Sequence, residues 1–89
     1  MRVAKRYLIT GRVQGVGFRL FTEDAAVREG ILGWVRNTSD GGVEVAAEGE
    51  AESLARFEQA IRHGPRAARV DRVEALDDVP GGHHGFTVR

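Results

Sequence analysis

The chain has no cysteine, only two prolines, and no apolar run long enough for a signal peptide or a membrane span. The lack of cysteine excludes a disulfide framework, a thiolate zinc site and a cysteine nucleophile. Arg2, Lys5 and Arg6 interrupt the apolar residues near the N terminus. These absences predict a soluble cytoplasmic protein that does not enter a membrane.

The formal net charge is zero, because 13 basic side chains balance 13 acidic ones. An even balance differs from the basic footprint of a nucleic-acid-binding domain, so no nucleic-acid partner is expected. The distribution is uneven, however, since residues 1–22 hold five basic side chains and no acidic one. This asymmetry fits either a solvated strand face or a small anion-binding site.

What is present is typical of a small globular protein. A hydrophobic fraction of 42% in 89 residues predicts one folded domain over residues 1–89. The apolar periodicity predicts six elements in order, namely strand 2–13, helix 18–29, strand 31–37, strand 42–49, helix 51–63 and strand 69–76. A seventh segment, residues 85–89, is compatible with a short fifth strand. In strand 42–49 the acidic residues Glu44 and Glu48 alternate with apolar residues, which predicts that one face of the strand is exposed to solvent.

This order of elements predicts an α+β fold of the ferredoxin-like type, βαββαβ, with an antiparallel sheet and both helices on one face. Right-handed crossovers then give the core strand order 4-1-3-2. The carboxyl ends of the first two strands lie at the same edge, about 10 Å apart across two strand spacings. A functional site is expected at that edge.

The segment GRVQGVGFR, residues 11–19, leads from the first strand into the first helix. Gly15 and Gly17 can adopt positive φ, so successive amides can point inward toward an anion. The helix N terminus adds free N–H groups, and Arg19 adds a planar fork suited to two phosphate oxygens. The glycine spacing fits neither the dinucleotide fingerprint nor the P-loop. From the residues alone, the segment is either an oxyanion cradle or a tight strand-to-helix turn.

Two longer segments narrow the choice. ITGRVQGVGFR, followed by GWVRNTSDGGVEVAAEG, resembles the acylphosphatase family, and the resemblance continues through GPRAARVDRVE to GFTVR. It implies a ferredoxin-like domain that hydrolyses the carboxyl–phosphate anhydride of acyl phosphates without a metal or a cofactor. The partners it implies are a small acyl phosphate and product phosphate, and we expect a monomer.

The resemblance also assigns roles to residues of this sequence. Arg19 would bind the phosphoryl group and Asn37 would orient the attacking water. Thr38, from its own position in the hairpin turn, is expected to support Asn37 by a hydrogen bond. The cradle would consist of Gln14, Gly15, Val16, Gly17 and Phe18. The chain departs from common family members at Leu20-Phe21, which we expect to face the helix packing and to affect stability rather than activity.

Elementary chemistry explains how so sparse a site could act. Neither Arg19 nor Asn37 titrates near neutral pH, so neither can serve as a general acid or base. Such a site suits only a good leaving group, such as a carboxylate whose acid has a pKa of about 4. The water's proton can pass to a phosphoryl oxygen of the substrate, whose second pKa is about 6.

Three other interpretations of the sequence give different functions. His83 and His84 are adjacent and lack an acidic or thiol partner, so no metal site is expected. An RNA-recognition module would need aromatic residues on its third strand, where this chain has acids. A non-catalytic domain that senses phosphate or carbamoyl phosphate stays open on the residues alone, although an intact Arg19 and Asn37 disfavour it.

Overall fold

A computed structural model describes all 89 residues. Its elements are β1 (Arg2–Arg12), α1 (Phe18–Glu29), β2 (Leu32–Asn37), β3 (Val43–Glu50), α2 (Ala51–His63), β4 (Arg69–Asp78) and β5 (Phe86–Val88). The predicted order is confirmed, and both helices span the predicted residues. Glycines end both helices, since Gly30 and Gly64 follow α1 and α2 with positive φ.

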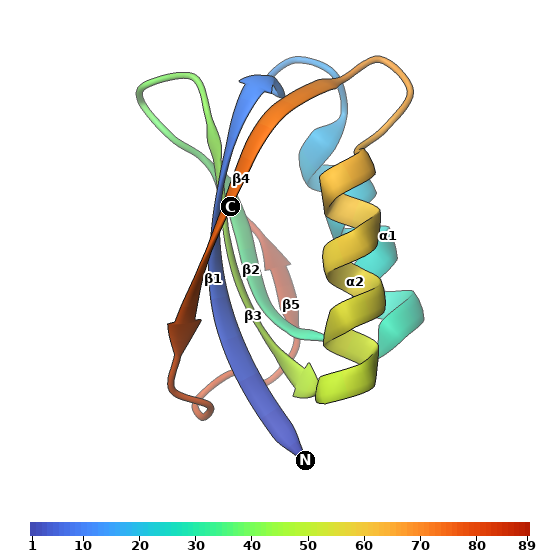
Figure 1. Ribbon diagram of the computed structural model, residues 1–89, viewed down its shortest axis with the longest axis vertical. Helices are drawn as coiled ribbons and strands as arrows, with labels where there is room; N and C mark the ends of the chain where they lie inside the picture. The colour runs from blue at the N-terminus through green and yellow to red at the C-terminus, as the bar shows by residue number, and fades with distance from the viewer.

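The strands form one sheet in the order β4-β1-β3-β2-β5, and both helices pack on the same face of it (Figure 1). The predicted core order 4-1-3-2 and the ferredoxin-like class are confirmed, and the fifth strand is present. β5 runs parallel to β2, whereas the other neighbouring pairs are antiparallel. The sheet is therefore mixed rather than wholly antiparallel.

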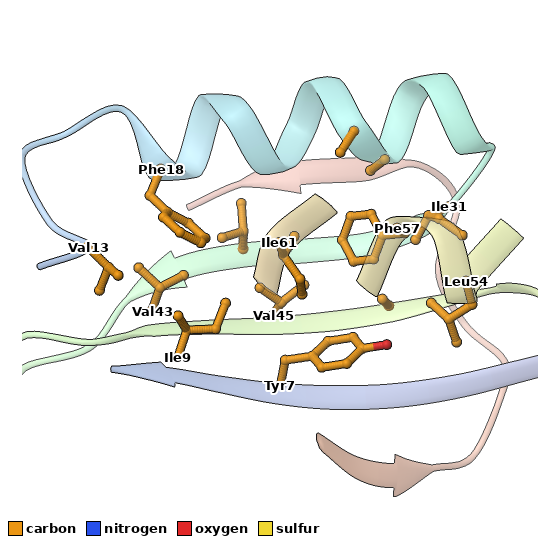
Figure 2. Packing of buried hydrophobic residues seen from close by; sticks show 14 residues of the cluster. Tyr7, Ile9, Val13, Phe18, Ile31, Val43, Val45, Leu54, Phe57 and Ile61 are labelled. Carbon is orange, nitrogen blue, oxygen red and sulfur yellow. The ribbon is translucent and has the colours of Figure 1, made fainter. Parts of the chain in front are cut away.

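The core fills the space between the sheet and the helices. Figure 2 shows Tyr7, Ile9 and Val45 of the sheet pointing toward Phe57 and Ile61 of α2. The rings of Tyr7 and Phe57 lie 6.3 Å apart, centroid to centroid. The Tyr7 hydroxyl donates to a Glu58 carboxylate oxygen at 3.1 Å, so the buried ring keeps a partner for its polar end. Burial and the neighbouring Glu58 carboxylate raise the pKa of Tyr7 well above its ordinary value.

On the face of the sheet that lacks helices, the structure differs from the predicted exposure of two acidic residues. Glu44 and Glu48 were expected to be wet, yet they are only 8% and 4% exposed. Arg6 and Arg36 donate to the Glu44 carboxylate at 3.1 and 2.7 Å, and Arg2 donates to Glu48 at 3.0 Å. The expectation was wrong because β3 is flanked by β1 and β2, whose arginines lie over the two acids.

The loop between β4 and β5 is tied to this same face. The amide of Gly81 donates to the Glu48 carboxylate at 3.0 Å. This bond, with Arg2, lowers the pKa of Glu48. The loop connects the two outer strands of the sheet, so the contact fixes the path by which β5 reaches its place beside β2.

The topology determines where the carboxyl ends of β1 and β2 lie. β1 and β2 both pair with β3 in antiparallel fashion, so the two strands run in the same direction. Their carboxyl ends therefore lie at one edge of the sheet, where β1 leads into α1 and β2 ends at Asn37. No helix in the structure is long and apolar enough to cross a bilayer.

Candidate active site

The loop between β1 and α1 has the backbone that the sequence predicts. Gly15 and Gly17 adopt φ of 74° and 79°, in the left-handed region that disfavours other residues. A Cβ atom at either position would meet no protein atom within 4 Å. Backbone conformation, rather than crowding, therefore favours glycine at these two positions, and the loop faces open space.

The amides of this loop and of the first helical turn are unused within the protein. No side chain caps the N terminus of α1, whose N-cap is Gly17. The first main-chain bond of the region is donated by Phe21 to the Gly17 carbonyl at 3.0 Å, and residues 15–20 donate none. Free N–H groups at the positive end of a helix dipole form a site suited to an anion. α1 also has no acidic residue in its first turn.

A hollow of about 290 Å³ lies beside these amides. It is lined by Val13, Gly15, Gly17, Phe18, Arg19, Leu20, Asn37 and Val88. The tertiary structure thus brings Arg19 of α1 and Asn37 of β2 to one hollow. The Phe18 side chain is 2% exposed and belongs to the core, so Phe18 offers its main chain there. Arg19 is the only ionisable residue of the lining.

Arg19 is oriented by a residue that sequence reasoning missed. Its Nη1 donates to the main-chain oxygen of Arg89 at 2.7 Å. The Arg89 amide donates to the Val35 carbonyl at 2.9 Å, and the Arg89 guanidinium lies 4.4 Å from the ring centroid of Trp34. These two contacts hold Arg89 beside β2. Arg19 has further N–H donors, so this bond directs the fork without exhausting it. A main-chain acceptor has no residue signature, and only the position of β5 reveals this contact.

Three of the predicted site residues do not line the hollow. The Gln14 side-chain amide donates to the carbonyls of Thr38 and Gly42 at 2.7 and 2.8 Å, and the Val16 side chain packs against the core. The Thr38 hydroxyl donates to Asp40 and accepts from the Gly42 amide at 2.9 Å. Thr38 therefore makes no hydrogen bond to Asn37, and it stabilises the turn that follows Asn37. The Thr38 hydroxyl lowers the pKa of Asp40.

Gln14 acts as a brace between the glycine loop and the β2–β3 turn, which leads to a stability prediction. Gln14→Ala should lower the free energy of unfolding by about 2 kcal/mol, at about 1 kcal/mol for each lost hydrogen bond. Urea unfolding measures the change. Gln59→Ala is the matched control, because Gln59 is exposed on α2 and should change stability by less than about 0.5 kcal/mol. Equal stabilities of the two variants would contradict the brace.

Leu20 and Phe21 differ from each other, and the structure corrects the prediction that both face the helix packing. Phe21 does pack, since its ring centroid lies 6.2 Å from that of Phe18. Leu20 is 62% exposed and lines the hollow. Consecutive helical residues point about 100° apart at 3.6 residues per turn, so the face that brings Phe21 onto Phe18 turns Leu20 outward.

Residues 5–88 match the family model described as Acylphosphatase. The chain belongs to the acylphosphatase family. The resemblance carried by the two sequence motifs is thereby confirmed, together with the enzyme class that it implied. The RNA-binding and non-catalytic alternatives are not favoured.

Individual relatives agree with the family match. The chain is 57% identical over 76 residues to an acylphosphatase of Koribacter versatilis, and this alignment covers 85% of this chain and 69% of that protein. It is 49% identical over 89 residues to an acylphosphatase of Salinibacter ruber, covering 99% and 92%. The crystal structure of acylphosphatase from Bacillus subtilis superposes with a TM-score of 0.94 at 36% identity and covers 98% of both chains.

Proposed function

We propose that this acylphosphatase hydrolyses the carboxyl–phosphate anhydride of acyl phosphates at the hollow beside Arg19. The observation that carries the proposal is the lining itself, which combines free main-chain amides, one guanidinium and one carboxamide. In this assignment the amides of the Gln14–Phe18 loop and Arg19 bind the phosphoryl oxygens. Asn37, at the end of β2, orients a water for in-line attack.

The reaction follows from this set of groups. The water oxygen forms a bond to phosphorus, and the bond from phosphorus to the carboxyl oxygen breaks. The electron pair leaves with the carboxylate, whose acid has a pKa of about 4 and needs no proton to depart. The water's proton passes to a phosphoryl oxygen, a group with a second pKa of about 6. The protein supplies positioning and charge stabilisation.

The roles divide between the two polar side chains. Arg19 carries a permanent charge and a fork that matches two phosphoryl oxygens, so it contributes to binding and to the transition state. Asn37 is neutral and can both donate and accept, which suits it to hold a water but not to deprotonate it. Alternation along β2 puts Asn37 on the same sheet face as the buried Val35, and thus on the side of α1.

The absence of titrating groups from the lining leads to a prediction about metal and pH. Acyl phosphate hydrolysis should persist unchanged in excess chelator, because no carboxylate, imidazole or thiol lines the hollow. The combined change of His63, His83 and His84 to Gln should leave kcat within about threefold, because surface substitutions rarely alter stability by more than about 0.5 kcal/mol each. Steady-state rates measured across pH test this prediction, and no change of slope in the pH–rate profile should come from the titration of a histidine.

A second substrate completes this test. An alkyl phosphate monoester has a poor leaving group and should not be turned over. Activity that depends on added metal, or rapid monoester hydrolysis, would overturn the mechanism even if acyl phosphates were also cleaved. A chelator-insensitive rate restricted to acyl phosphates is the expected result.

We further propose that the enzyme acts in the cytoplasm as a monomer and without nucleic acid. The even balance of 13 basic and 13 acidic side chains supports the last point. Light scattering of the purified protein tests the monomer, and retention on immobilised RNA at low salt tests the independence from nucleic acid.

A further inference from the structure

Leu20 is an exposed leucine in the wall of the hollow that holds Arg19 and Asn37. An exposed leucine alone needs no explanation, since much of a protein surface is apolar. The other large exposed hydrophobics are Met1, Val27, Leu76 and Val79, and none of them lines this hollow. The position of Leu20 therefore calls for a reason that the position of the others does not.

The direction of the Leu20 side chain follows from helix geometry. Leu20 is the third residue of α1, whose first residue is Phe18. Helical side chains lean toward the N terminus of their helix and cover the turn that precedes their own Cα atom. Leu20 therefore leans toward the glycine loop and its free amides, instead of away into solvent.

The lining of the hollow is thus divided into a polar and an apolar part. The amides, Arg19 and Asn37 offer hydrogen bonds, whereas Leu20 and Val88 offer hydrocarbon. The remaining apolar members, Val13 and Phe18, are 1% and 2% exposed, so they have little surface left for a ligand. Leu20 is the lining residue with the largest apolar surface available for a contact.

An acyl phosphate has the same two parts, a phosphoryl group and an acyl group. We propose that Leu20, with Val88, contacts the acyl group, and that the site favours acyl phosphates with an aromatic or branched aliphatic acyl group. This inference rests on the proposed function, since the phosphoryl group must occupy the cradle for the acyl group to lie beside Leu20. A leucine offers no hydrogen bond, so a polar acyl group placed against it would lose its bonds to water.

The test compares two substrates on wild-type protein and on Leu20→Ser. Benzoyl phosphate presents an aromatic ring, and acetyl phosphate presents only a methyl group. For Leu20→Ser, kcat/KM should fall about tenfold with benzoyl phosphate, at the low end of the range for a lost hydrophobic contact in a pocket. With acetyl phosphate it should stay within about twofold of wild type, because a methyl group makes little of that contact. Leu20→Met keeps an apolar side chain and should retain the benzoyl rate.

Val27→Ser is the matched control. Val27 is 72% exposed on the same helix, and it lies about 10 Å further along the axis at 1.5 Å per residue. Both rates should be unchanged in this variant. Thermal unfolding of each variant checks that the fold is intact.

The outcomes separate this inference from the function on which it rests. Hydrolysis of neither substrate by the wild-type protein would overturn the proposed function, and the acyl contact with it. Hydrolysis of both by wild type, with equal losses or no loss in Leu20→Ser, would overturn the acyl contact alone. A selective loss with benzoyl phosphate, absent from Val27→Ser, would establish it.

Discussion

Replacement of Arg19 by Gln is expected to lower kcat/KM for an acyl phosphate by at least about 100-fold. The substitution keeps much of the side-chain bulk but removes the charge and the fork. One preorganised donor aimed at developing charge is typically worth about 10²–10³ in rate, and more where binding also depends on it. Steady-state kinetics with benzoyl phosphate measure the loss, and calorimetry should show that binding of inorganic phosphate is lost as well.

Folding should be nearly unaffected by this change, because the side-chain bond from Arg19 to the Arg89 oxygen is exposed. A stability change of about 0.5 kcal/mol or less is expected for such a site. Arg66→Gln is the control, since Arg66 is an exposed arginine with no ion pair in the structure, and it should keep full activity. A variant at Arg19 that kept more than about a tenth of wild-type activity would refute the phosphate-binding role by this argument.

Replacement of Asn37 by Ala should abolish turnover while leaving phosphate binding nearly intact. An interaction made chiefly in the transition state affects kcat rather than ground-state affinity, and its loss costs about 10²–10³ in rate. Calorimetric titration with inorganic phosphate separates the two roles. Arg19→Gln should lose binding, and Asn37→Ala should keep it.

Ser39→Ala is the control for Asn37. Ser39 is exposed in the same turn and makes no side-chain hydrogen bond, so its loss should change neither kcat nor phosphate binding. If Asn37→Ala weakened phosphate binding as much as Arg19→Gln, Asn37 would be a second phosphate ligand or a structural turn residue. Water orientation would then need another group.

Local sequence determined much of this protein. α1 and α2 begin and end where helix formers and the glycines Gly30 and Gly64 predict, because propensity and capping act within a few residues. The positive φ of Gly15 and Gly17 was likewise foreseeable, since the requirement lies in the residues themselves. The alternation of strands and helices was sufficient for the core order 4-1-3-2, because handedness rules leave few topologies.

Contacts between distant segments were decided by the tertiary structure alone. Alternation predicts a solvent-exposed Glu44, yet Arg6 and Arg36 donate to its carboxylate from the strands on both sides. Gln14 belongs to the proposed phosphate-binding loop by its main chain, whereas its side-chain carboxamide donates to carbonyls of the β2–β3 turn. Alternation tells which face a side chain takes, and it carries no information about which long side chain lies across from it.

The hollow beside Arg19 also depends partly on local sequence and partly on tertiary contacts. Two motifs indicated Arg19 and Asn37, but only the fold puts β5 beside β2, and with it the Arg89 oxygen that orients Arg19. Likewise the sequence has Leu20 next to Arg19, whereas its exposure depends on which face of α1 meets the core through Phe18 and Phe21. Residue chemistry and backbone freedom are local properties that a sequence carries openly. The burial of a side chain and the choice of its hydrogen-bond partner are decided only when elements far apart in the chain pack together, because both depend on long-range contacts.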